Sequence, residues 1–251
     1  MTETYGGAGR FGVGVPQSNP TVEAEFGVLL PRTASLHVTR LTSRAEDPIA
    51  RLRAYLTDLA HYLEAYDGLK LAAFAFACTG SSYLVGKEEE AEIVAACAAR
   101  FGYPIAPAAD SIVWALEKLN ARRIAVIAPY PAALIEAGHA YFESRGIHVQ
   151  SLERIVTSSA DTRSIYLTGV ADARAALARV PTQGIDAILI SGTGMPSLAE
   201  VDTHGRPPIL SSNLCAAARA LDLAGKTEML DALGIEPQGW RRRLDEAYGR
   251  A

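Results

Sequence analysis

The chain has few cysteines, few aromatic residues and no long apolar segment. Its 3 cysteines among 251 residues lie far apart, and no Cys-x-x-Cys or His-x-x-x-His motif accompanies them. This pattern predicts a reduced compartment and no structural metal. The longest apolar runs are too short to cross a membrane, and the amino terminus lacks the apolar core of a signal peptide. We therefore expect a cytoplasmic protein that binds no membrane.

Positive charge is not in excess. Lys and Arg total 24 against 28 Asp and Glu, which gives a net charge of −4, and the basic residues are scattered along the chain. Nucleic-acid binding needs a concentrated basic surface, so we expect no such partner. Hydrophobic residues make up 49% of the chain, which is enough for a substantial core.

Apolar runs of strand length alternate with amphipathic helical patterns along most of the chain. We expect strands near residues 11–15, 35–41, 71–78, 123–128, 148–152 and 187–190. We expect helices near residues 21–30, 47–66, 87–101, 110–119, 131–145, 164–180 and 214–223, with a short helix near Trp240. This alternation is typical of parallel sheets covered by helices.

Short segments of the first half recur in the second. Residues 15–17 resemble residues 128–130, and residues 76–81 resemble residues 190–195, with offsets of 113 and 114 positions. A nearly constant offset indicates a duplication. We predict an α/β fold of two pseudo-symmetric, doubly wound parallel-sheet halves with the active site in the cleft between them. We expect an N-terminal half over residues 11–120, a C-terminal half over residues 121–225 and a helical tail over residues 226–251. The C-terminal helices are candidates to complete the N-terminal half.

Cys78 is the first candidate for chemistry. It follows the apolar run 71–77 and precedes a turn at Gly80-Ser81-Ser82, so it lies at the carboxyl end of a strand, where open α/β sheets place their sites. Backbone N–H groups of such a turn lower the pKa of a thiol. A buried core cysteine fits the position equally well. Thr79, Ser81 and Thr193 supply hydroxyl groups that suit a carboxylate or an enediolate.

Asn19 and Tyr130 each follow a predicted strand and would add an amide and a phenol donor. Their structural alternatives are an Asx-turn and a rim aromatic. No histidine lies beside a strand end, His204 being the only loop candidate, so acyl transfer by a Cys/His pair is disfavoured. Cys97 and Cys215 lie on apolar helix faces, as packing residues do.

Five motifs together resemble the aspartate/glutamate racemase superfamily, in the branch that contains maleate cis–trans isomerase and arylmalonate decarboxylase. They are Pro16-Gln-Ser-Asn19 with Glu23, Ala77-Cys-Thr-Gly-Ser81, Ala128-Pro-Tyr130, Ile190-Ser-Gly-Thr193 and Ile209-Leu-Ser-Ser-Asn213. The resemblance extends from Phe11 to about Leu223. It implies an enzyme without a cofactor that binds a small dicarboxylate between its two halves.

The resemblance also implies roles for single residues. Cys78 matches the first of two cysteines that racemases and isomerases of the family use, and Gly192 stands at the second position. Asn19 and Tyr130 match carboxylate-binding positions of the isomerases, while Thr79, Tyr130 and Thr193 match positions around the oxyanion hole of the decarboxylase. Gly80 stands where the decarboxylase has a hydroxyl group, so Ser81 or a backbone N–H would replace it. An Asn of the isomerases is absent from the region 160–163.

Because only Cys78 offers a thiol at the two matched positions, we can rank three hypotheses of function. Racemisation by two bases needs a side chain on each face of a planar intermediate, and Gly192 has none. The leading hypothesis is therefore a lyase, a decarboxylase of a malonate-type dicarboxylate, whose enediolate is held in an oxyanion hole and protonated by Cys78. The first alternative is a maleate-type cis–trans isomerase with Cys78 as nucleophile. The second is a non-catalytic protein that binds dicarboxylates. A homo-oligomer is compatible with the sequence.

Overall fold

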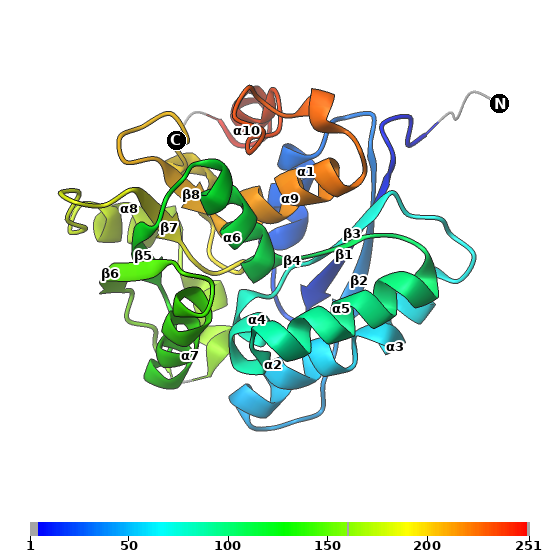
Figure 1. The fold of residues 1–251 in the computed structure, drawn as a ribbon, viewed down its shortest axis with the longest axis horizontal. Coiled ribbons are helices and arrows are strands. Elements are labelled where there is room, and N and C mark those ends of the chain that lie inside the picture. Colours follow the sequence, from blue (N-terminus) through cyan, green and yellow to red (C-terminus); the bar gives the residue numbers. More distant parts are fainter. Residues whose placement is uncertain (1–4, 160, 250–251) are drawn as a thin grey trace.

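The computed structural model describes residues 5–159 and 161–249 and contains two four-stranded parallel sheets (Figure 1). The first sheet has the order β2-β1-β3-β4 and the second the order β6-β5-β7-β8. The strands are β1 (Arg10–Pro16), β2 (Ser35–Leu41), β3 (Ala73–Phe76), β4 (Ile105–Pro107), β5 (Arg123–Ala128), β6 (His148–Arg154), β7 (Ala187–Ile190) and β8 (Ile209–Ser211). The equivalent order of the two sheets confirms the predicted pseudo-symmetric α/β fold.

The apolar runs of the sequence form the inner strands. Every residue of β3 and of β7 is buried, because helices cover both faces of a parallel sheet. The edge strand β6 alternates between exposed and partly buried residues instead. The same difference between inner and edge strands explains why β3 and β7 carry no charged side chain.

The helices are α1 (Val22–Leu29), α2 (Pro48–Thr57), α3 (Leu59–Leu63), α4 (Thr79–Val85), α5 (Lys87–Phe101), α6 (Ala108–Lys118), α7 (Ala132–Glu143), α8 (Val170–Leu177), α9 (Ser212–Leu223) and α10 (Trp240–Tyr248). Short 3-10 helices are η1 (Glu64–Tyr66), η2 (Thr162–Leu167), η3 (Leu198–Glu200) and η4 (Thr227–Met229). Helix α9 follows the second sheet but packs against α6, α1 and β3 of the first half (Figure 1). Both halves therefore share one hydrophobic core.

Two predicted helices are interrupted. The helix expected at residues 47–66 breaks at Asp58 into α2, α3 and η1, although its apolar face stays buried on one side. The helix expected at residues 164–180 is wrong as a single element, because Gly169 is extended between η2 and α8. The Asp172 carboxylate accepts a hydrogen bond from the Gly169 N–H and so starts α8 anew.

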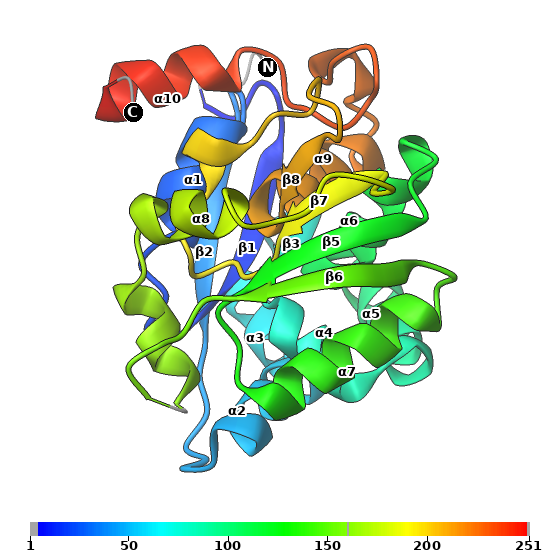
Figure 2. The same cartoon turned by 90° about the vertical axis from the view of Figure 1, so that its left-hand side faces the viewer.

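The carboxyl ends of β1 and β5 point to a common region between the two sheets (Figure 2). The turn after β3 and the turn after β7 lie in the same region, because these strands pair in parallel with β1 and β5. Within the described residues, we find no helix with the length and apolarity that a membrane span requires.

Candidate active site

The turn from β3 into α4 forms the first wall of the site. Cys78 is the N-cap residue of α4 and only 4% exposed. The Ser81 hydroxyl lies 3.1 Å from the Cys78 sulfur, and the backbone N–H groups of Gly80 and Ser81 also donate to it. Burial nevertheless raises the pKa of the Cys78 thiol, and the hydrogen bonds only partly oppose this effect. The expectation of a lowered pKa is therefore wrong, and the thiol holds its proton at neutral pH.

Tyr130 joins the first wall from the other half of the molecule. It follows β5, and its hydroxyl lies 2.6 Å from the hydroxyl of Thr79. Burial raises the pKa of Tyr130 to about 12, so the phenol remains a proton-bearing donor. The pair places two hydroxyl groups side by side next to Cys78, as an oxyanion hole requires.

The turn after β7 forms the second wall. Gly192 has a φ of 127°, which disfavours any side chain, and its N–H donates to the Ser212 hydroxyl over 3.0 Å. The Thr193 hydroxyl donates to the Ala77 carbonyl oxygen over 2.8 Å. These two donors are thus already engaged within the protein.

Asn19 fills the space between the walls and is almost completely buried. Its Oδ1 accepts hydrogen bonds from the N–H groups of Thr21 and Val22, which is the Asx-turn alternative. Its Nδ2 lies 3.4 Å from the Thr193 hydroxyl. The side chain therefore caps the start of α1 and presents its amide to the site at the same time.

These residues enclose a cavity of about 30 Å³, which has room for about two water molecules. It is lined by Pro16, Asn19, Leu52, Cys78, Thr79, Gly80, Tyr130, Leu134, Thr162, Ile165, Tyr166, Gly192, Thr193 and Gly194. The structure thus brings together seven of the eight candidates, and the eighth, Ser81, contacts the Cys78 sulfur from outside the lining.

Leu52, Leu134 and the three residues from η2 were not identified from the sequence. A Cβ atom at Gly80 would lie 3.2 Å from Leu134 and 3.3 Å from Leu52, so these two leucines close over the cysteine turn only because position 80 is glycine. Their role follows from packing between distant elements, and no local sequence pattern reports it.

Glu25 supports the second wall from behind and was also missed. It is buried, and its carboxylate accepts hydrogen bonds from Ser197 N over 2.8 Å and Asn213 Nδ2 over 2.7 Å. The same Asn213 amide donates to the Thr193 carbonyl oxygen over 3.0 Å. A signal did exist in the sequence, because Glu25 interrupts the apolar face of α1 between Val22 and Leu29.

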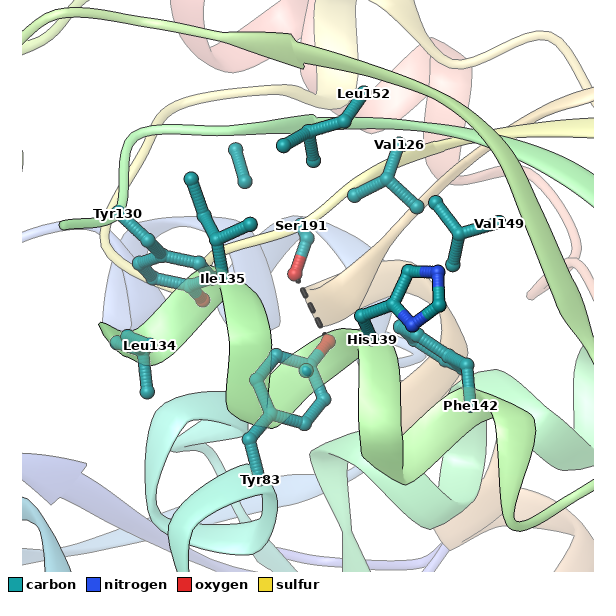
Figure 3. A pocket seen from close by; sticks show the side chains of 12 residues that line it. Tyr83, Val126, Tyr130, Leu134, Ile135, His139, Phe142, Val149, Leu152 and Ser191 are labelled. Carbon is teal, nitrogen blue, oxygen red and sulfur yellow. Dashed lines mark hydrogen bonds between the residues drawn. The ribbon is translucent and has the colours of Figure 1, made fainter. Parts of the chain in front are cut away.

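A second cavity of about 40 Å³ lies behind Tyr130 (Figure 3). Its lining is mainly apolar and comes from β5, β6 and α7. Tyr83 and Ser191 are polar exceptions, and their hydroxyl groups lie 3.0 Å apart. Tyr130 and Leu134 line both cavities and therefore separate this space from Cys78.

Within the described residues, His204, Asp231 and Glu236 have metal-ligand atoms within 4.8 Å of one another. Glu236 already accepts hydrogen bonds from Trp240 and Arg241, which occupy one of its oxygens. None of the three lines the Cys78 cavity. His204, the loop histidine of the sequence, is therefore not part of the site, and Cys97 and Cys215 are buried elsewhere, in α5 and α9.

Comparison with known proteins gives consistent matches. The family model described as arylmalonate decarboxylase matches residues 40–235. A maleate isomerase of Nocardia farcinica is 29% identical over 235 residues, which cover 86% of this chain and 92% of that protein. A solved Cys-to-Ser mutant of the Nocardia farcinica maleate cis–trans isomerase, with a covalently bound succinylcysteine intermediate, is 26% identical, has a TM-score of 0.73, and covers 85% of this chain and 93% of its own. An arylmalonate decarboxylase structure is 19% identical and has a TM-score of 0.74, and the match covers 95% of this chain and 100% of that chain.

Proposed function

Because the chain belongs to the arylmalonate decarboxylase family, whose model matches residues 40–235, we propose that it is an enzyme that converts a small dicarboxylate with Cys78. We further propose that the reaction is cis–trans isomerisation of a maleate-type enedioate. The observation that carries this proposal is the lining of the cavity: a thiol, two paired hydroxyl groups and the Asn19 amide border one space. The maleate isomerases among the relatives support the same choice. We therefore place the isomerase before the decarboxylase, which is the reverse of the order that we drew from the sequence.

In the proposed reaction, the Cys78 sulfur forms a bond to one alkene carbon. The π electrons move toward the neighbouring carboxylate, and the resulting enediolate accepts hydrogen bonds from Thr79 and Tyr130. The proton of the thiol passes to the second carbon, which gives a succinyl adduct. Rotation about the new single bond precedes the reverse steps: the proton leaves carbon, the C–S bond breaks, and Cys78 regains its proton. Atoms and electrons balance without a co-reactant.

The raised pKa of Cys78 is compatible with this sequence of steps, because the thiol carries the proton that the substrate needs. Ser81 and the N–H groups of the turn stabilise the thiolate that forms transiently. The succinylcysteine in the Nocardia farcinica mutant, in which serine replaces one cysteine, supports addition to a single thiol. A second cysteine is therefore not needed for the covalent step.

Decarboxylation remains the second candidate, and the bare wall at Gly192 favours it. A malonate-type substrate would lose carbon dioxide, the enediolate would accept hydrogen bonds from Thr79 and Tyr130, and protonated Cys78 would deliver a proton to one face. The thiolate would then regain a proton from water.

Proton NMR in deuterated water distinguishes the candidates. The protein is incubated separately with maleate, an alkylmalonate and an arylmalonate, and Cys78→Ser is compared with Cys97→Ser, a matched substitution at a buried cysteine outside the site. We expect fumarate from maleate, abolished by Cys78→Ser and retained by Cys97→Ser. Loss of carbon dioxide with one deuterium gained would instead establish the decarboxylase. Binding without turnover would indicate a non-catalytic dicarboxylate-binding protein.

A further inference from the structure

The short helix η2 supplies side chains to the second wall of the site. Thr162, Ile165 and Tyr166 from this helix line the Cys78 cavity. The Tyr166 ring lies directly over Gly194: a Cβ atom at position 194 would be 2.6 Å from Cε1 and 2.7 Å from Cδ1 of the ring. Because position 194 has no side chain, the space that a side chain would need there is taken by the Tyr166 ring.

Tyr166 lines the same cavity as Cys78 and Tyr130. It interacts electrostatically with Cys78, Tyr55 and Tyr130, all of which raise the pKa of its phenol together with burial, the largest cause. The group therefore bears its proton throughout the physiological range. Over residues 5–159 and 161–249, no protein group accepts a hydrogen bond from this hydroxyl, whereas Thr79 and Tyr130 are paired with each other.

The position of η2 is fixed from the first half of the molecule. Asp161, directly before η2, forms an ion pair of 2.6 Å with the buried Arg51 of α2. The same carboxylate binds Arg163 over 2.5 Å. These contacts hold the segment across the junction of the two halves, so that Tyr166 faces the cavity from a defined support.

We propose that the Tyr166 hydroxyl is the hydrogen-bond donor of the second wall and binds the carboxylate of the substrate that Thr79 and Tyr130 do not hold. A dicarboxylate needs donors at both of its ends. Of the two hydroxyl groups on this wall, that of Thr193 already donates within the protein, so the Tyr166 hydroxyl is the one that can join the Asn19 amide at the second carboxylate. The inference deepens the proposed function and rests on it for the class of substrate.

Calorimetric titration tests this role without turnover in a Cys78→Ser background. The ligands are maleate and acrylate, which differ by one carboxylate. We expect Tyr166→Phe to weaken maleate binding roughly tenfold to a hundredfold, the usual effect of losing a hydrogen bond to a charged group, and to change acrylate binding by less than about twofold. Tyr103→Phe is the matched control, because its hydroxyl is buried without a partner in the described residues and Tyr103 does not line the cavity.

Equal maleate affinity with and without the Tyr166 hydroxyl would overturn the inference and leave the proposed function standing. If neither maleate nor an alkylmalonate binds the Cys78→Ser protein, both fail. Gly194→Ala gives an independent check, since the added methyl group displaces the Tyr166 ring. We expect the double variant Gly194→Ala with Tyr166→Phe to bind maleate no more weakly than Tyr166→Phe alone. If the losses of maleate affinity in the two single variants add up in the double variant, Gly194→Ala does not act through the Tyr166 hydroxyl.

Discussion

The buried carboxyl group of Glu25 makes the free energy of unfolding depend on pH. Burial raises the pKa of Glu25 from 4.5 to about 7, and the hydrogen bonds from Ser197, Asn213 and Leu198 only partly oppose this. The unfolded chain titrates near the lower value. Between the two values the folded state therefore binds more protons than the unfolded state, so the stability that Glu25 contributes is fully present below pH 4.5 and is lost as the pH rises through 7.

The size of this effect follows from the same two values. At about 1.4 kcal/mol for each pH unit between 4.5 and about 7, Glu25 changes the free energy of unfolding by about 3 kcal/mol. Glu25→Gln removes the titration and retains an acceptor for Ser197 N.

Urea unfolding of the wild type and of Glu25→Gln between pH 4 and pH 8 measures the difference. We expect the free energy of unfolding of the wild type, relative to the variant, to fall by about 3 kcal/mol over this range. Glu23→Gln is the control, because Glu23 lies on the same helix and pairs with Arg40 at the surface. A difference between wild type and Glu25→Gln that stays constant with pH would refute the reasoning.

Burial of Cys78 predicts slow alkylation by iodoacetamide at neutral pH, with a rate that rises about tenfold per pH unit up to pH 9 because only the thiolate reacts. Ser81→Ala should slow the reaction further, since the sulfur loses a donor, and a rate plateau below pH 8 would contradict both expectations. Gly192→Cys should destabilise the fold by about 1–3 kcal/mol, because position 192 has a φ of 127°. The same variant should racemise a chiral α-substituted carboxylate, read by chiral chromatography, whereas Gly192→Ala should share the loss of stability without racemisation.

Much of the fold could be predicted because it depends on local patterns. Buried parallel strands require continuous apolar runs, and β3 and β7 show them. The recurrence of the cysteine turn at Gly192 predicted two equivalent sheets, and the strand order confirms them. Helix continuity was less predictable, since a single residue such as Asp58 or Gly169 ends a helix while the apolar periodicity continues.

The properties of the site depended on groups that the chain brings together from far apart. Asn19 was expected either in an Asx-turn or at the site, and the structure gives it both positions, because its amide spans the space between α1 and Thr193. The direction of the Cys78 pKa change was wrong for a similar reason. A turn of N–H groups is visible in the sequence, but the burial that outweighs their effect on the pKa arises from tertiary packing around the turn.

The sequence by itself determined the α/β class, the duplication and the place of Cys78 at a strand end, because hydrophobic periodicity and turn residues act within a few positions of the chain. Only the tertiary structure decided that Tyr166 covers Gly194 on the second wall and that Glu25 carries a raised pKa behind it. The position of the Tyr166 ring depends on backbone far away in the sequence that has no side chain in its way. The pKa of Glu25 depends on its burial and on hydrogen-bond donors that are also far away in the sequence. Packing sets these relations, and no neighbouring residues encode them.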